Sequence, residues 1–590
     1  MALGATSCED FLTLYPQDRV VEENFWEDKN DLEGVRYGAY QHMAGTVEKL
    51  IVWGDIRSDA YAQNDYSDQQ KQYDLYKKIV EAQLDSTMDV YDWGSVYTTI
   101  NYCNKVLSHG EQVLERDAQF TRTEWEQMKA EMTAMRALNY FYLLRAFKNI
   151  PYSNEVINSD ADTHPFTTTK QMDVLDILIK DVRSVAGKGR NRYTSIADTR
   201  GLMTNTAIYA LLAEMYLWRS ALREGRGCSE DSVRMDADSV VYYGQLSIDA
   251  LALQNQQLNL GIAERTRNLT DDFGSGLKNA QLLKNEGMEN SYNAKLTVSV
   301  PSYNEIFGDY STRGNTAGNS DESIFELQYD VNNLKNKFVN SFWGHSDATH
   351  FATSYSAMSN ILGNNFSKDS RMWYTCARRT TDNTSSNDEY KEGYMLKYSY
   401  SNFVFSSGVF KSRVASDEGH NWIFYRLTDV MLMMAEAEAV RGNFQACRNI
   451  VDAIHKRASL DQRTGLSANS DNNKEKCIDL VMKERLLELA GEGKRWFDLV
   501  RYAERIGGGH NADPFEPEIK DGADGVAKMI DNFLGKGSYG KLVSVLKNRI
   551  KNRYGLYSPI YYMELRANKY LFPQNPTWNR EKGLVIGTAE

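Results

Sequence analysis

Acidic and basic side chains are concentrated in the stretch KERLLELAGEGKRWFDLVRY, which runs from Lys483 to Tyr502. Two carboxyl groups about 5–9 Å apart could hydrolyse a glycosidic bond. Glu488, Glu492 and Asp498, however, each lie three residues from an arginine, and residues at this spacing are neighbours on a helix. The pairs are Arg485/Glu488, Glu492/Arg495 and Asp498/Arg501. An adjacent guanidinium keeps a carboxylate ionised and unfit as a general acid, so we predict structural ion pairs in this stretch.

Other catalytic and metal-binding patterns are missing from the sequence. It contains no H-E-x-x-H, G-x-S-x-G, P-loop or G-x-G-x-x-G motif. One acidic loop could hold Ca²⁺ through carboxylate oxygens, although its spacing is not that of an EF-hand and a solvated loop is the competing interpretation. Its residues are Asp513, Glu516, Glu518, Asp521 and Asp524. We therefore predict no cofactor and no metal site, and a structural calcium ion is the alternative left open.

Composition narrows the class of protein. The 590 residues carry a net charge of −12, which argues against a nucleic-acid partner because phosphates need a basic surface. No apolar run reaches the 18 residues needed for a membrane-spanning helix. Nine prolines are few for this length and suit a largely helical chain. We expect the internal cysteines to be mostly free and buried: Cys103, Cys228, Cys376, Cys447 and Cys477.

The elements that must position these residues are mainly helices. Amphipathic patterns predict helices over 124–151 and 204–221, and the second contains the L-A-x-x-Y spacing of a tetratricopeptide (TPR) unit. Residues 426–458 predict a helical hairpin with its turn at Gly442 and Asn443. Small residues on the second helix of that hairpin would allow close packing. We predict a mainly α fold with a TPR-like scaffold of helical hairpins.

The pattern changes between residues 261 and 420, where helical periodicity weakens and Gly, Ser, Asn and Thr become frequent. Residues 323–329 and 394–400 are typical of short strands. We interpret this region as a loop-rich insert, and binding residues often lie in such loops on a rigid scaffold. Trp93 and Trp343 lie among Asp, Asn, Ser and Gly, where rings could stack on sugars; the competing interpretation is that each Trp anchors its loop to the core. The contact candidates from the insert and its edge are Trp343, Tyr355, Arg371, Trp373 and Trp422.

The stretch 485–501 also closely resembles the C-terminal signature R-x-x-E-L-x-x-E-G-x-R-W-x-D-L-x-R of the SusD/RagB family, whose members are surface lipoproteins that capture nutrients for an outer-membrane transporter. Two further matches support it. Residues 425–437 resemble the family's Y-R-x-x-D-x-x-L-x-x-A-E-A, and residues 131–143 resemble its E-x-x-x-x-R-A-x-x-Y-F-x-L helix. The resemblance spans nearly the whole chain, although the C-terminal Pro-containing turns depart from the family in order and spacing.

The resemblance implies a lipid-anchored protein of the outer membrane. Thr6-Ser7-Cys8 followed by Glu9-Asp10 resembles a lipoprotein processing site, so Cys8 would carry the lipid and residues 1–12 would form the tether. The N-terminal helical part would then cover 13–260, the ligand-binding insert 261–420, and the signature part 421–590. In the family, the loop between the segments near residues 53 and 93 contributes to ligand capture, which makes Tyr66, Tyr91 and Trp93 candidates.

The function implied is capture of oligosaccharides without catalysis and their delivery to a SusC-like TonB-dependent transporter. Two alternatives remain open. A peptide-binding member of the same family would use fewer stacking aromatics. An α-helical-barrel glycoside hydrolase would require two unpaired carboxylates in a deep cleft.

Overall fold

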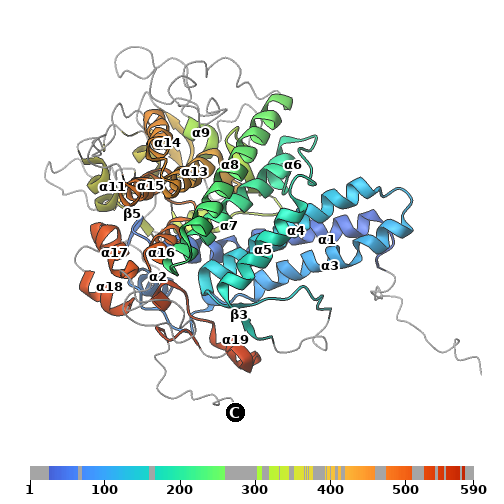
Figure 1. Ribbon diagram of the computed structural model, residues 1–590, viewed down its shortest axis with the longest axis horizontal. Helices are drawn as coiled ribbons and strands as arrows, with labels where there is room; N and C mark the ends of the chain where they lie inside the picture. Colours follow the sequence, from blue (N-terminus) through green and yellow to red (C-terminus); the bar gives the residue numbers. More distant parts are fainter. Residues whose placement is uncertain are drawn as a thin grey trace, which may run out of the picture.

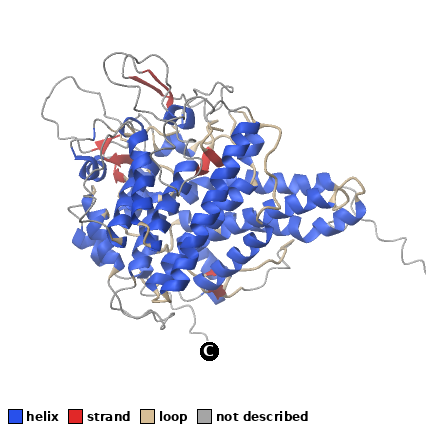
Figure 2. Cartoon of the chain, turned by 45° about the horizontal axis from the view of Figure 1, so that its top comes forward, coloured by secondary structure: helices blue, strands red, loops and turns tan. Residues whose placement is uncertain are grey.

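The computed structural model describes a large part of the chain. The described residues are 25–63, 70–158, 166–258, 302–307, 318–330, 332–343, 351–363, 366, 369, 371–376, 392–393, 395–398, 400–404, 409–412, 419–458, 473–507, 524–537, 543–550, 553–571 and 574–578. Figures 1 and 2 show a predominantly helical molecule with a few short strands, as the sequence predicted.

The N-terminal part of the scaffold consists of long helices packed in antiparallel pairs. α3 packs on both α1 and α4, and this group forms the projection at the right of Figure 1. The elements are α1 (Lys29–Ile51), η3 (Val52–Ile56), β1 (Tyr61–Gln63), α2 (Gln70–Val80), η4 (Asp89–Tyr91), α3 (Gly94–Arg116), α4 (Arg122–Phe147), β2 (Ile150–Pro151), β3 (Thr168–Thr169), α5 (Gln171–Val185), α6 (Ile196–Gly201), α7 (Asn205–Gly225) and α8 (Glu230–Gln257). The predicted helices over 124–151 and 204–221 correspond to α4 and α7.

Local sequence explains where these helices begin and how closely they approach. Thr121 starts α4 through a capping box, in which its side chain accepts from the Glu124 amide and the Glu124 side chain accepts from the Thr121 amide. Gly110 lets α3 approach the Trp125 ring of α4, because a Cβ at this position would lie 2.0 Å from the ring. α7 then pairs along its length with α8.

The middle of the chain contributes short elements. They are α9 (Ser302–Phe307), β4 (Ser323–Leu327), α10 (Phe338–Phe342), β5 (Phe351–Ser354), α11 (Tyr355–Leu362), α12 (Met372–Thr375), β6 (Glu392–Gly393), β7 (Tyr400–Val404), β8 (Val409–Ser412) and β9 (Trp422–Arg426). The strand predicted over 323–329 is confirmed as β4, which pairs antiparallel with β9. The strand predicted over 394–400 is wrong: residues 397 and 398 form a turn between β6 and β7, and Tyr398 has a positive φ of 66° that a strand does not allow.

The C-terminal part returns to helices. Its elements are α13 (Leu427–Arg441), α14 (Phe444–Arg457), α15 (Lys474–Leu489), α16 (Arg495–Ile506), α17 (Gly525–Asn532), η8 (Leu534–Lys536), α18 (Val543–Arg549), η10 (Arg553–Leu556), α19 (Tyr562–Ala567) and η11 (Lys569–Leu571). The predicted hairpin over 426–458 is confirmed as α13 and α14. Gly442 ends α13 in the left-handed region, with φ 86°.

One continuous hydrophobic core joins the N-terminal and C-terminal helices. α13 packs on α8, and α16 packs on α7, so segments far apart in the sequence share this core. Four of the five internal cysteines are buried and free, as expected, while Cys228 is free but exposed. The predicted division into four parts stays a prediction. No helix among the described residues is long and apolar enough to cross a membrane.

Candidate ligand-binding face

A small antiparallel sheet brings together the ends of two chain segments that the sequence suggested for binding. β1 pairs with β5 in a register that sets Gln63 opposite Phe351. Gln63 is the last residue before the segment 64–69, and Phe351 is the first residue after the segment 344–350. The first segment therefore starts, and the second finishes, at the same end of the β1–β5 strand pair, which we call the β1–β5 edge. Tyr66 and residues 344–350 themselves lie outside the described part of the chain.

A stack of aromatic rings lies next to this edge. The ring of Tyr61 in β1 lies parallel to that of Trp343, with 6.4 Å between the ring centroids and 14° between the planes. Trp343 stacks in turn on Trp422 of β9 at 6.0 Å, and Trp422 stacks on Tyr398 at 4.9 Å. All four side chains are at most 2 % exposed. The stack packs next to the β1–β5 edge and joins three distant parts of the chain.

Asp55 connects the aromatic stack to the signature stretch 485–501. Its carboxylate accepts hydrogen bonds from the Tyr61 hydroxyl at 2.7 Å and from the backbone amides of Gly493 and Arg495. Complete burial raises the Asp55 pKa to about 7, although these hydrogen bonds oppose the shift. The neighbouring Gly54 is required for this approach, because a Cβ there would lie 2.2 Å from the Gly493 carbonyl oxygen. Asp55 belongs to η3, a single π-helical turn.

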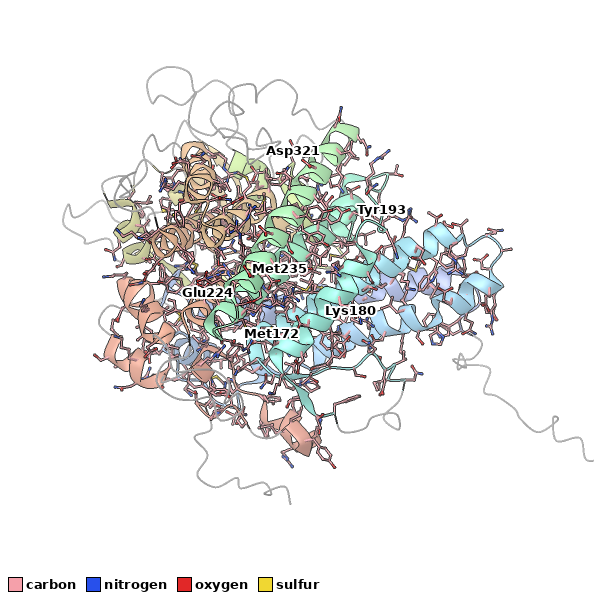
Figure 3. The ribbon with its side chains drawn as sticks, in the orientation of Figure 1. Met172, Lys180, Tyr193, Glu224, Met235 and Asp321 are labelled. Carbon is pink, nitrogen blue, oxygen red and sulfur yellow. The ribbon has the colours of Figure 1, made fainter. Side chains whose placement is uncertain are left out.

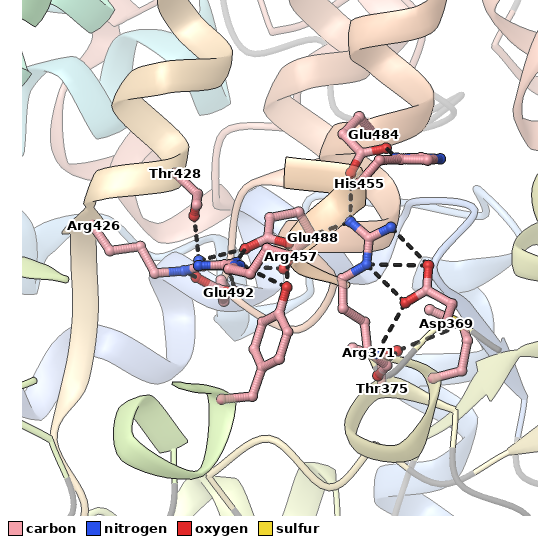
Figure 4. Close-up of polar contacts among 12 residues, drawn as sticks. Asp369, Arg371, Thr375, Arg426, Thr428, His455, Arg457, Glu484, Glu488 and Glu492 are labelled. Carbon is pink, nitrogen blue, oxygen red and sulfur yellow. Dashed lines mark hydrogen bonds and ion pairs between the residues drawn. The ribbon is translucent and has the colours of Figure 1, made fainter. Parts of the chain in front are cut away.

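A buried carboxylate–arginine network supports the same region from α14 and α15 (Figure 4). At its centre is Glu488, whose carboxylate is paired with Arg426 at 2.7 Å, with Arg371 at 3.3 Å and with Arg457. The Tyr303 hydroxyl also donates to Glu488. The remaining members of this network are Glu322, Asp369, Lys397, His455, Glu484 and Glu492. Arg371 and Lys397 come from the middle of the chain, so the network fixes the insert onto the C-terminal helices.

The predicted ion pairs are confirmed in kind but corrected in partner. Asp498 and Arg501 form the expected pair at 2.9 Å. Arg485 does not pair with Glu488 and instead contacts Asp429 and Asp498. The Glu492/Arg495 prediction is also wrong. Glu492 pairs with Lys397 and Arg426, whereas Arg495 pairs with Asp59 at 2.7 Å. The helix break at Gly491 and Gly493, both at positive φ, turns Glu492 and Arg495 toward different neighbours.

The carboxyl groups of Glu488, Glu492 and Asp498 are nevertheless held in their ionised form, as predicted. Burial acts to raise the Glu488 pKa, but the surrounding Arg457, Arg426 and Arg371 outweigh it and hold that pKa well below its usual range. The pKa of Glu492 and that of Asp498 are lowered for the same reason, with burial opposed by adjacent arginines. These carboxyl groups stay ionised at neutral pH and cannot donate a proton to a leaving group.

The structure separates the candidate contact residues by burial. Arg371 is 1 % exposed and forms ion pairs with Asp369, Glu484 and Glu488, and its predicted contact with a ligand stays a prediction. Trp343 and Tyr91 are fully buried, and their predicted contact with a ligand also stays a prediction. Trp422, also buried, belongs to the aromatic stack. Tyr66 and Cys8 and the side chains of Tyr355 and Trp373 lie outside the described part.

Trp93 lines a groove of about 470 Å³ on another side of the molecule, between α3, residues 151–157 and α19. Only 2 % of its surface is exposed. Glu564 lies on the groove wall beside Asp92, and the two carboxyl groups are within hydrogen-bonding distance of each other. Burial, followed by contact with Asp92, raises the Glu564 pKa to about 7. This pair is too close to hold a glycosidic bond between its members, since hydrolysis needs about 5 Å or more.

The predicted calcium loop is largely outside the described part. Its one described member, Asp524, caps α17 by accepting from the Ala527 amide. Elsewhere in the described ranges, no group of three or more His, Cys, Asp and Glu is placed to hold a metal ion.

Sequence reasoning missed Asp55 and Tyr61, because neither lies in a recognisable motif. The one local signal was the polar run GDIRSDAY that follows Trp53.

The chain matches two protein-family models. Residues 302–578 match a model described as the SusD family, and residues 10–217 match a model described as starch-binding associating with outer membrane. The chain belongs to the SusD/RagB family. A relative, SusD-like protein P38 of Formosa agariphila, is 21 % identical over 522 residues, which cover 85 % of this chain and 89 % of that protein.

Solved SusD structures share the fold. A SusD superfamily protein from Bacteroides vulgatus aligns with a TM-score of 0.61 and 17 % identity, covering 94 % of this SusD-family chain and 100 % of the other. A laminarin-binding SusD-like protein aligns with a TM-score of 0.57 and 17 % identity, covering 93 % and 99 %. The family is one of glycan-binding proteins, and its model name associates it with the outer membrane.

Proposed function

We propose that this SusD-family protein captures oligosaccharides at the sheet edge between β1 and β5 and passes them, unaltered, to a SusC-like TonB-dependent transporter. A lipid on Cys8 would hold it at the cell surface. The observation that carries the proposal is the register of Gln63 opposite Phe351, which joins the segment containing Tyr66 to the segment after Trp343. Sugars bind where aromatic faces and hydrogen-bonding groups are held rigidly together.

The packing next to the β1–β5 edge suits ligand capture. The aromatic stack and the carboxylate–arginine network are buried and densely packed, so they hold β1 and β5 in a fixed arrangement before a ligand binds. Binding rather than hydrolysis is favoured because Glu488, Glu492 and Asp498 are locked in ion pairs. The laminarin-binding relative suggests β-glucans as the first ligands to test.

Isothermal titration and native affinity electrophoresis against laminarin, starch, other polysaccharides and peptides would test this function, with product analysis of each mixture. We expect binding to a glycan without cleavage, and at least about fivefold weaker binding by Tyr66→Ala. The matched control is Tyr37→Ala on α1, whose side chain is 49 % exposed. Shortened glycan products would establish a hydrolase instead. Exclusive binding of peptides would establish the peptide-binding alternative.

A further inference from the structure

A cluster of tyrosines lies on the α7–α8 face, away from the β1–β5 edge. Figure 3 shows this face at the front, where Lys180 marks α5 and Met235 marks α8. Tyr209 and Tyr216 come from α7, and Tyr242 and Tyr243 come from α8. The Tyr242 side chain is 60 % exposed, Tyr209 and Tyr243 are partly exposed, and Tyr216 is buried. Several exposed or partly exposed aromatic side chains that touch one another form a patch, and such patches can mark binding surfaces.

The rings support one another in layers. Tyr243 lies parallel to the buried Tyr216, with a centroid distance of 5.7 Å and an interplanar angle of 11°. Tyr209 stacks on Tyr243 at 6.4 Å, and Tyr242 meets Tyr243 edge-on at 5.0 Å and 76°. These contacts restrain the exposed rings before any ligand arrives. A ligand that covers them would therefore cost little side-chain entropy.

The polar groups beneath the rings are already engaged. Arg219 lies over the Tyr216 ring at 5.0 Å and forms ion pairs with Asp236 at 2.6 Å and Asp176 at 2.7 Å. The exposed Arg183 side chain also lies beside Tyr216. In contrast, the hydroxyls of Tyr209, Tyr242 and Tyr243 have no hydrogen-bond partner within the described ranges. The surface thus offers aromatic faces and hydroxyl groups, with Arg219 compensated by carboxylates and Arg183 exposed beside the rings.

This combination matches an uncharged ligand with alternating C–H faces and hydroxyl groups. Pyranose rings present such C–H faces to aromatic rings, and their hydroxyls can exchange hydrogen bonds with phenols. A nucleic acid or another acidic ligand is disfavoured by the net charge of −12. We infer that Tyr209, Tyr242 and Tyr243 form a second glycan-binding site. This inference rests on the proposed function, because it assumes that glycans reach this protein.

A second site would act together with the first on long chains. A polysaccharide held at both would dissociate more slowly than a short oligosaccharide held at one, because the second contact is intramolecular. The expected signature is stronger retention of polysaccharide than the affinity for short fragments would predict.

The test uses the full chain, a short oligosaccharide and its parent polysaccharide. We expect a stoichiometry of two for the oligosaccharide with the wild type, and of one for Tyr242→Ala and for Tyr66→Ala. Tyr242→Ala should weaken polysaccharide retention at least about fivefold. Met235→Ala, which removes a 67 % exposed side chain from the same helix, should change neither result.

Each alternative outcome is distinct. A wild-type stoichiometry of one that Tyr66→Ala abolishes and Tyr242→Ala leaves intact would overturn the second site but keep the proposed function. Absence of binding to every glycan would overturn both. If Tyr242→Ala changed only self-association, measured by analytical ultracentrifugation, the face would be a protein interface and the glycan inference would be overturned.

Discussion

The buried carboxylate–arginine network provides the sharpest test of how this fold is held together. Glu488 is fully buried, and its two oxygens face Arg426 at 2.7 Å, Arg371 at 3.3 Å, and Arg457. Glu488→Gln keeps the shape but removes the charge, and it directs an amide donor toward guanidinium donors. Breaking a buried pair by neutralising one partner typically costs about 3–5 kcal/mol, and we expect a loss of stability in this range.

The matched control is Glu111→Gln. Glu111 pairs with Arg122 at 2.6 Å, a distance as short as those in the network, but its side chain is 51 % exposed. Solvent screens such a pair, so the expected loss is at most about 1 kcal/mol. Urea unfolding at pH 7, followed by tryptophan fluorescence and circular dichroism, measures both variants. Equal, small losses for the two would refute the view that burial makes the network essential.

The pH dependence of the same variant checks the electrostatic origin. The folded-state pKa of Glu488 is well below its ordinary value, so its stabilisation is present above the unfolded pKa of about 4.5 and is lost as the pH falls through the folded pKa. The stability difference between wild type and Glu488→Gln should therefore shrink on acidification below about pH 4.5. A difference that stayed constant down to pH 2 would indicate a steric cause.

Three further perturbations follow from the structure. The raised pKa of Glu564 means that its contribution to stability is complete below the unfolded pKa of about 4.5 and is lost as the pH rises through about 7. Glu564→Gln should therefore stabilise the protein at pH 8 and leave its stability unchanged at about pH 4, measured by thermal unfolding. Equal effects at both pH values would contradict this. Gly45→Ala in α1 has open space around the new Cβ and should stabilise the protein by about 0.5–1 kcal/mol in urea unfolding. Gly110→Ala should destabilise it by about 2 kcal/mol or more, since the new Cβ would meet the Trp125 ring. The same sign for both substitutions would refute the packing argument. Chelation of divalent cations should leave glycan affinity unchanged in titration, because no group of three or more His, Cys, Asp and Glu among the described residues is placed to hold a metal ion. A large loss of affinity would point to a bound metal ion.

Much of this protein follows from local sequence patterns. Helical periodicity predicted α4 and α7, and a glycine after an amphipathic run predicted the α13–α14 turn, because these features depend on neighbours within a few residues. The signature stretch identified the family. The proximity of acids and arginines in it also predicted correctly that Glu488, Glu492 and Asp498 stay ionised.

Only the tertiary structure decided which charges meet and which aromatic rings are accessible. Arg371, Arg426 and Arg457 reach Glu488 from distant segments, and a glycine break reorients Arg495 toward Asp59, so sequence spacing could not assign these pairs. Trp343 and Trp93 have polar neighbours in sequence that suggested exposed rings, yet both side chains are buried, the first in a ring stack and the second beneath a groove. Burial is set by the whole packed chain, whereas residue type and spacing report only on the local segment.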